Sequence, residues 1–241
     1  MKKYILLILL AYNSVFSQSR GIITYDIGFN LTIEKIDERI RKMKKKPNKE
    51  LIQALKERVR NSTKLEGVLT FSGTVSNYKL SNSLSNEVNG EGMKLLKSSS
   101  GGENLYWVSM IKNECKAQDC KTLDECFVIN KESLEWELIQ ETKIVGDYLC
   151  YKAININSKN KIKKTVAWYT PDIPLSFGPK YYHGLPGLIL EIEEAAITIR
   201  AKKIKLNPEE NIPLKSSILG KEVSEKKFKE ILLKSFPELY K

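Results

Sequence analysis

The sequence predicts an α+β fold: a curved, mostly antiparallel meandering β-sheet with helices packed on one face. Three observations lead to this prediction. Short segments with alternating apolar residues follow one another closely along the 241 residues, a stretch with helical periodicity interrupts them early, and a second such stretch closes the chain. Short connections between consecutive strands favour antiparallel neighbours. Helices that are separate from the run of strands, and do not alternate with them, indicate the α+β class.

The expected strands are defined by period-two alternation and by β-branched and aromatic residues. In the first of them, Ile23, Tyr25 and Ile27 share one face. Near Lys202 and Lys203 the alternation slips by one residue, which predicts a β-bulge. The expected strands are 21–29, 67–80, 105–110, 126–129, 135–142, 148–156, 165–170, 188–193 and 196–206.

Two regions show helical spacing. In residues 33–61 aliphatic side chains recur every three or four residues and Pro47 interrupts them, which predicts an inserted helical hairpin. We expect this hairpin to pack on the sheet; contact with a membrane surface is the alternative, which the lack of Trp and Phe disfavours. A C-terminal amphipathic helix carrying Phe228, Ile231 and Leu232 is predicted at 223–233.

The N-terminus resembles a secretory signal peptide. Met1–Lys3 is basic, residues 4–12 are mostly apolar but too few to span a bilayer, and cleavage is expected near Ser17. Residues 1–17 would then be removed, and 18–241 would form a single domain. No cysteine lies directly after the apolar run, near the expected cleavage site, so a lipid anchor is not expected. The protein is predicted to be exported, periplasmic or secreted, without a transmembrane segment.

The chain is basic, with a formal net charge of +11. The basic residues concentrate in 39–46, 159–164 and 202–205. For an exported protein nucleic acid is not the expected partner. An ordinary solvated surface is the default interpretation, and contact with an anionic outer-membrane surface is the alternative.

The four cysteines are an even set, and in an oxidising compartment they predict two disulfides with three alternative pairings. A metal site or free thiols are the alternatives. Their spacing matches no C-x-x-C zinc or redox motif, so neither a metal nor a cofactor is predicted. The four residues are Cys115, Cys120, Cys126 and Cys150.

The most informative segment runs from Trp168 to Glu191. Its prolines and glycines predict a rigid loop between two strands. One interpretation is a structural corner formed by Gly178, Pro179, Gly184, Leu185, Pro186 and Gly187. The other is that aromatic side chains on the braced loop line a binding site. The candidate binding residues are Trp168, Tyr169, Phe177, Tyr181, Tyr182 and His183.

This segment, with its Gly184-Leu-Pro-Gly-Leu-Ile sequence, resembles the signature of the GLPGLI family. Further similarities are Trp136-Glu-Leu, Glu141-Thr-Lys-Ile and Tyr148-Leu-Cys-Tyr-Lys-Ala; the turn at Gly146-Asp147-Tyr148 departs from the family pattern. The resemblance covers roughly residues 71–206. It implies an exported, functionally uncharacterised protein of a kind found mainly in Bacteroidota.

Catalytic motifs are absent from the sequence. There is one histidine, and no zinc-protease, nucleophile-elbow or phosphate-loop pattern. We therefore expect a non-catalytic protein that binds an apolar or amphiphilic ligand in the concavity of its sheet, or an envelope partner. One alternative is a secreted hydrolase using His183 or the acidic residues Asp172, Glu191, Glu193 and Glu194. Another is an accessory partner of outer-membrane uptake machinery.

Overall fold

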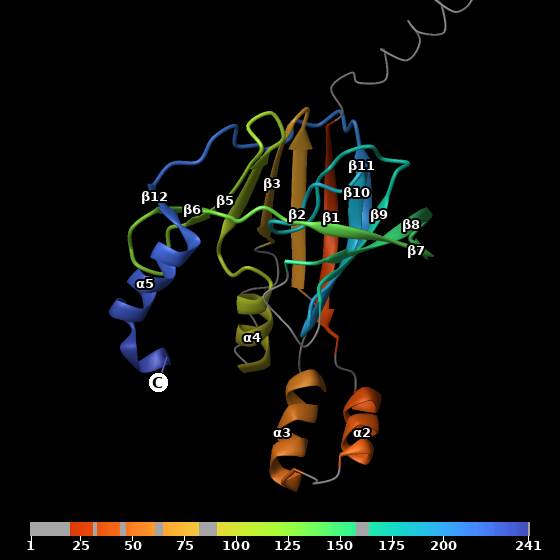
Figure 1. The fold of residues 1–241 in the computed structure, drawn as a ribbon, viewed down its shortest axis with the longest axis vertical. Helices are drawn as coiled ribbons and strands as arrows, with labels where there is room; N and C mark the ends of the chain where they lie inside the picture. The colour runs from red at the N-terminus through yellow and green to blue at the C-terminus, as the bar shows by residue number, and fades with distance from the viewer. Residues whose placement is uncertain are drawn as a thin grey trace, which may run out of the picture.

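The computed structural model describes residues 20–30, 33–43, 47–60, 65–81, 91–157 and 164–240. The predicted signal peptide lies outside these residues. A single open sheet of 12 strands dominates the fold, and the helices are short and lie at its margins (Figure 1). The predicted α+β class is therefore wrong, because the helices cover little of the sheet. The predicted curvature is present.

The strand order is β12-β6-β5-β4-β3-β2-β1-β11-β10-β9-β8-β7. Apart from β12, each half of the sheet is an antiparallel meander, and β1 joins the halves by pairing with both β2 and β11. Strand β12 runs parallel to β6, so the sheet is mixed. The strands are β1 Arg20–Phe29, β2 Leu65–Ser72, β3 Val75–Leu80, β4 Leu105–Ser109, β5 Glu114–Asp119, β6 Phe127–Asn130, β7 Trp136–Val145, β8 Tyr148–Asn155, β9 Val166–Thr170, β10 Leu188–Glu193, β11 Ile197–Leu206 and β12 Lys221–Ser224.

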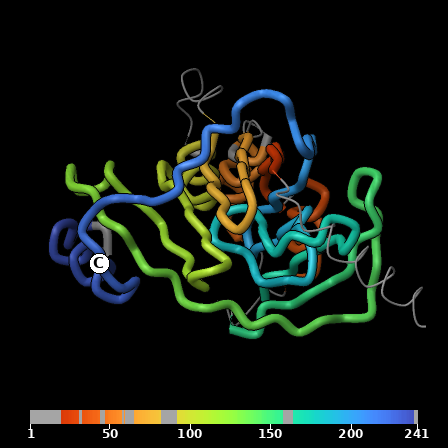
Figure 2. The backbone as a smooth tube through the Cα atoms, turned by 90° about the horizontal axis from the view of Figure 1, so that it is seen from above, coloured from red at the N-terminus to blue at the C-terminus, as the bar shows by residue number. Residues whose placement is uncertain are grey.

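The connection from β6 to β7 requires the sheet to curl. These strands are ten positions apart in the sheet, which would be about 48 Å in a flat sheet. Asn130 and Trp136 are joined by five intervening residues, which reach about 21 Å at most. In Figure 2 this part of the chain runs along one side of the molecule from the β6 end to the β7 end. The two ends of the sheet therefore approach each other across a concave inner face.

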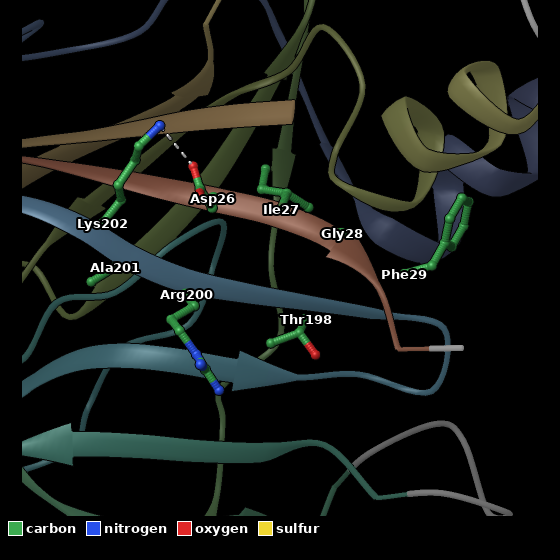
Figure 3. Close-up of a pocket in the computed structure, with 8 residues that line it drawn as sticks. All are labelled: Asp26, Ile27, Gly28, Phe29, Thr198, Arg200, Ala201 and Lys202. Atoms are coloured by element: carbon green, nitrogen blue, oxygen red, sulfur yellow. Dashed lines mark ion pairs between the residues drawn. The ribbon is translucent and has the colours of Figure 1, made fainter. Parts of the chain in front are cut away.

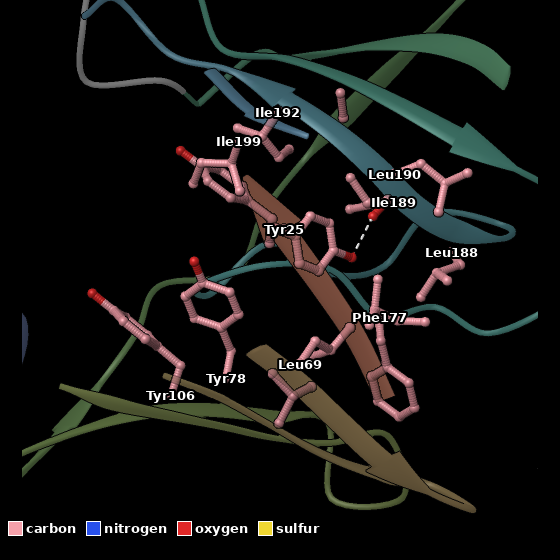
Figure 4. Close-up of a cluster of buried hydrophobic side chains, with 14 of the residues drawn as sticks. Tyr25, Leu69, Tyr78, Tyr106, Phe177, Leu188, Ile189, Leu190, Ile192 and Ile199 are labelled. Carbon is pink, nitrogen blue, oxygen red and sulfur yellow. Dashed lines mark hydrogen bonds between the residues drawn. The ribbon is translucent and has the colours of Figure 1, made fainter. Parts of the chain in front are cut away.

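The inner face holds the core. Ile23, Tyr25 and Ile27 alternate on β1 and are fully buried there. Tyr78 on β3 packs edge-to-face against Tyr25 and at a tilt against Tyr106, with ring centroids 6.2 Å from each. Figure 4 shows these rings beside the aliphatic residues of β10 and β11. On the opposite, outer face, β1 presents Thr24 and Asp26, which are only partly buried. The predicted bulge is confirmed, since the β1–β11 register shifts opposite Lys202.

The helical hairpin expected to pack on the sheet does not do so. Helices α2 (Ile33–Lys42) and α3 (Lys49–Arg60) are present, but they lie beyond the end of β1 and β2 (Figure 1). Ile36 is buried, whereas Leu51 is 63% exposed. The apolar stripe of α3 therefore has no sheet surface beneath it, and the prediction of a packed hairpin is wrong.

Two further helices contact the sheet. Helix α4 (Glu91–Ser99) buries Met93 and Leu96. Helix α5 (Glu225–Ser235) confirms the predicted C-terminal helix and is capped by the hydroxyl of Ser224, which accepts a hydrogen bond from the Lys227 backbone N–H. Phe228 of α5 packs on Phe127 of β6 with ring centroids 5.3 Å apart. Because β6 and β12 lie at one end of the sheet, α5 covers that edge.

Candidate functional site

The loop of residues 171–187, here called the signature loop, folds back over the inner face of the sheet. The backbone N–H groups of Leu188 and Ile189 donate to the carbonyls of Ile173 and Phe177, both at 2.9 Å. The Tyr25 hydroxyl donates to the carbonyl of Ile189 at 2.7 Å (Figure 4). These bonds join the loop to β10, and β10 to the centre of the sheet.

The glycines of the signature loop permit close backbone contacts. A Cβ atom on Gly187 would lie 2.1 Å from the Thr170 carbonyl oxygen, and one on Gly178 would lie 2.8 Å from that of Tyr182. Gly184 has a φ of +90°, which disfavours any residue with a side chain. Leu185 is a core residue, Pro179 is buried and Pro186 is exposed. This part of the loop is thus fitted to the sheet.

Phe177 and Tyr182 of the predicted binding residues are core residues. Phe177 is 1% exposed and stacks on Phe71 with ring centroids 6.0 Å apart. Tyr182 is 2% exposed, and its ring contacts those of Tyr181 at 4.5 Å and of Trp136 at 6.2 Å. These two side chains fill the concavity in which the sequence predicted a ligand.

A largely buried ion pair connects the signature loop to the residue that follows β10. Lys180 has a φ of +57°, and its ammonium group lies 2.5 Å from Glu194 Oε1 and 3.1 Å from the Ser99 carbonyl oxygen. The Tyr182 hydroxyl donates to the same carboxylate oxygen at 3.0 Å. Burial raises the pKa of Tyr182, and the charge of Glu194 raises it further. We call Lys180, Tyr182 and Glu194 the Lys180 cluster.

Both ends of the sheet meet at residues 181–183. From the β6 end, the Lys131 ammonium lies 4.9 Å from the centre of the Tyr181 ring. From the β7 end, the Trp136 indole N–H donates to the His183 carbonyl at 2.9 Å. The signature loop therefore contacts the two halves of the curled sheet.

The environment of His183 predicts that the stability of the fold depends on pH. Its Nδ1–H donates to the Tyr181 carbonyl at 2.9 Å, but burial lowers the pKa of the imidazole below its ordinary value. Below about pH 6.5 the unfolded chain then binds more protons than the folded one. We expect stability to fall on acidification through this window, by at most about 1.4 kcal/mol per pH unit from this group.

Urea unfolding at pH 7.5 and 5.5 measures this effect, with His183→Gln as the comparison. His183 is the only histidine, so the two proteins differ only in this titration near pH 6. The variant should lose less stability than the wild type between the two pH values. Equal losses in both proteins would show that His183 is protonated as readily in the folded state as in the unfolded state.

Trp168 and Tyr169 of the predicted site lie on opposite faces of β9. Tyr169 is on the inner face, beside Tyr151 at a centroid distance of 6.1 Å. The Trp168 indole is on the outer face, where its N–H donates to Glu193 Oε1 at 3.0 Å. The ammonium of Lys143 lies 4.2 Å from the centre of the Trp168 ring. The six predicted binding residues therefore do not converge on one cavity.

The predicted acidic residues are also divided between two networks. Glu191 is 1% exposed on the outer face and is paired with Lys143 at 2.8 Å and with Arg200 at 2.7 Å. Glu194 belongs to the Lys180 cluster, and Asp172 is exposed. Glu191 is buried and Glu194 is partly buried, and each has a cationic partner. This arrangement is typical of structural ion pairs.

A shallow pocket of about 320 Å³ opens on the outer face between β1 and β11 (Figure 3). Arg200 and Lys202 line it together with Asp26 and Thr198. Arg200 bonds Glu191, and Lys202 pairs with Asp26 at 3.3 Å and with Glu66 at 2.8 Å. The two cationic side chains that line this pocket are thus already neutralised by carboxylates of the protein.

The cysteines form one disulfide, between Cys120 and Cys126. The prediction of a second is wrong, because Cys115 and Cys150 are buried free thiols on β5 and β8, in different halves of the sheet. Burial raises the pKa of Cys115 to about 12 and that of Cys150 to about 11. Neither thiol has the lowered pKa of a nucleophile. The part of the chain that the structure describes contains no group of three or more potential metal ligands.

The β7–β8 hairpin carries an apolar surface that was not predicted from the sequence. Ile144 and Leu149 are directly opposite each other, and Tyr151 and Leu138 continue the same face. Their side chains are 65%, 42%, 37% and 56% exposed, in that order. We call these four residues the apolar hairpin face. It extends the inner face beyond the signature loop, at the end of the sheet.

The comparisons place the fold but not an activity. A family described as "Protein of unknown function (Porph_ging)" matches residues 157–191, which include β9 and the signature loop. A comparison with curated proteins gave no match. Part of PNGF-II has a similar fold. Its crystal structure in space group P21 has a TM-score of 0.52 at 17% identity, and covers 91% of this chain and 34% of its own.

A second PNGF-II structure, in space group C2, agrees, with a TM-score of 0.53 at 16% identity. It covers 91% of this chain and 33% of the other. The chain thus spans about a third of the PNGF-II chains. Within the described residues, no helix is long and apolar enough to cross a membrane.

Proposed function

We propose that this chain is an exported, non-catalytic protein of the GLPGLI type, and that it binds an envelope protein through the apolar hairpin face. The observation that carries this proposal is the row of four exposed apolar side chains on β7 and β8. Apolar side chains gathered on one surface are typical of sites that contact another protein. The disulfide supports an oxidising compartment.

The filled concavity favours a partner at the surface over a ligand inside the sheet. Phe177, Tyr182 and Leu185, all at most 2% exposed, belong to the hydrophobic core, and Phe177 stacks on Phe71 of β2. An apolar ligand there would have to displace the signature loop and break its hydrogen bonds to β10. The apolar hairpin face needs no such rearrangement.

The edge of β7 is less suited to binding than its face. β7 is the last strand of the sheet, but its pairing with β8 shifts register between Ile139 and Thr142. Glu137 and Glu141 are exposed along it. Bulges and charged residues are devices that prevent strand addition at an edge. We therefore place the partner on the side chains of the hairpin. In PNGF-II the similar fold is part of a chain about three times as long, so the remaining two thirds of that chain accompany it there.

A membrane-impermeant cross-linker applied to intact cells tests export and binding together, because it reacts only with proteins outside the inner membrane. Partners are identified by mass spectrometry, and affinity is then measured with the purified partner. The variant is Ile144→Lys with Leu149→Lys. The control is Ile111→Lys with Leu219→Lys, which adds the same charges at two positions outside the strands that are 80% and 79% exposed.

We expect the hairpin variant to bind at least tenfold more weakly, because each lysine adds a charge at an apolar contact. The control should bind as the wild type does. Equal binding by both variants would contradict the proposal. So would a dimer of this chain that the hairpin variant abolishes, or binding to lipid vesicles in place of a protein.

A further inference from the structure

A second pocket lies at the other half of the sheet, beside α4. It has a volume of about 520 Å³ and is lined by three segments of the chain. These are the second half of α4, the turn at 101–104, and the start of the loop that follows β5. Tyr106 of β4 also lines it. We call it the α4 pocket, and its size is that of a small-molecule site.

The walls of the α4 pocket are held in place by local bonds. The helix ends in a tight turn in which the N–H groups of Ser100 and Gly102 donate to the carbonyls of Leu96 and Lys97, both at 2.9 Å. Gly101 has a φ of +106°, and a Cβ atom there would lie 2.8 Å from the Tyr106 ring. The Cys120–Cys126 disulfide closes the loop on the other wall. The pocket is thus formed before any ligand binds.

Both carboxylates that line the α4 pocket have partners within the protein, and that of Glu103 is neutralised by an ion pair. Glu103 pairs with Lys97. Asp119 is buried and accepts hydrogen bonds from the backbone N–H groups of Lys121 and Thr122, at 2.9 and 3.0 Å. Its second carboxylate oxygen accepts from the Thr122 hydroxyl at 2.6 Å.

Two lysines at the α4 pocket are left without such partners. Lys94 on α4 and Lys121 on the disulfide loop are exposed, and neither forms an ion pair with any residue that the structure describes. They line the pocket from two different walls, and these two cations outnumber the one lining carboxylate, Asp119, that has only neutral hydrogen-bond donors as partners. Ser98 and Asn104 add a hydroxyl and an amide to the lining.

We propose that the α4 pocket binds the anionic group, phosphate or carboxylate, of a small polar molecule, with Lys94 and Lys121 as its ligands. An anion between these two ammonium groups gains charge-assisted hydrogen bonds from both walls. The polar lining suits hydroxyl or amide groups on the remainder of the molecule. This site is separate from the apolar hairpin face and does not depend on it.

Calorimetric titration of the mature protein with inorganic phosphate, glycerol 3-phosphate and glucuronate, at constant ionic strength set with chloride, tests this site. The variant is Lys94→Gln with Lys121→Gln. The control is Lys112→Gln with Lys229→Gln, which removes the same charge from exposed positions outside the pocket. All four positions are exposed, so each protein should fold, which its melting curve checks.

We expect at least tenfold weaker binding in the pocket variant and unchanged binding in the control. Lys94→Arg with Lys121→Arg should stay within about threefold of the wild type, because the charges are kept. Removing the disulfide with Cys120→Ala and Cys126→Ala should weaken binding without changing charge. The three probes distinguish a phosphate site from a carboxylate site.

Three results would overturn the proposal. An equal loss in the control would mean that general surface charge attracts the anions. Unchanged affinity in the pocket variant would place the anion elsewhere on the protein. Absence of measurable binding by any of the three probes would exclude an anion site.

Discussion

Gly187→Ala is expected to lower the free energy of unfolding by about 3 kcal/mol or more. The new Cβ atom would lie 2.1 Å from the Thr170 carbonyl oxygen and 2.6 Å from its carbonyl carbon. Both are backbone atoms, so no side chain can rotate away to make room. Relief requires that the signature loop move away from the end of β9, which also weakens its packing on the core.

Chemical denaturation of both proteins measures this loss, with Gly28→Ala as the matched control. Gly28 is also in the sheet, on β1, but a Cβ atom there meets nothing within 4 Å. The control should stay within about 0.5 kcal/mol of the wild type, as surface substitutions usually do. A Gly187→Ala protein as stable as the control would mean that the loop tolerates displacement from β9.

The second large effect is expected at Glu194. Glu194→Gln should destabilise the fold by about 3 kcal/mol, because it leaves the buried Lys180 ammonium without its counter-charge. The side chain of Lys180 is only 7% exposed, so water cannot easily replace the carboxylate. Glutamine has the same shape and still offers an oxygen to the Tyr182 hydroxyl, so the loss is attributable to charge.

The double variant Lys180→Met with Glu194→Gln separates charge from packing. It removes the unpaired cation, and we expect it to recover at least half of the stability that Glu194→Gln loses. The Ser99 carbonyl then loses a donor, which limits the recovery by about 1 kcal/mol. A double variant no more stable than Glu194→Gln would show that the loss does not come from the isolated charge. Thermal and urea unfolding of the three proteins provide the measurement.

Local features of the fold could be predicted from the sequence. The alternation of Ile23, Tyr25 and Ile27 places β1 correctly, and the slipped alternation at Lys202 places the bulge, because a strand's face is encoded by its own residues. The pairing of β1 with β11 is not encoded locally, so the order of the strands could not be predicted. Helical periodicity likewise predicted the positions of α2 and α3. It did not predict which surface they contact.

The candidate site was harder to predict than the fold. Phe177 and Tyr182 were expected to line a site because aromatic residues beside turn glycines occur both in binding loops and in loops that pack on a core. The sequence distinguishes these cases only through the fold of the loop, which turns back on the sheet. The four cysteines suggested two disulfides, but β5 and β8 hold Cys115 and Cys150 in different halves of the sheet.

The two newly identified surfaces carry weak sequence signals. Leu149, Tyr151 and Ala153 alternate on β8 as core residues do, and nothing local indicates that the signature loop stops short of the apolar hairpin face. Lys94 and Lys121 belong to segments that meet only in the folded chain. An alternating strand at the end of a sheet, with no later segment to cover it, is the pattern that would have indicated the first surface.

The position of β1 has a consequence for how the chain folds. Within each half of the sheet, nearly every strand pairs with its neighbour in sequence, so each half can form through local contacts. The only strand pairing between the halves is that of β1 with β11, which comes from near the other end of the chain. Such distant pairings are slow to form because the intervening chain must first be ordered. The rate of folding should therefore be limited by the pairing of two preformed halves. In native-state hydrogen exchange, the two halves should then open as separate cooperative units, with their boundary between β1 and β11.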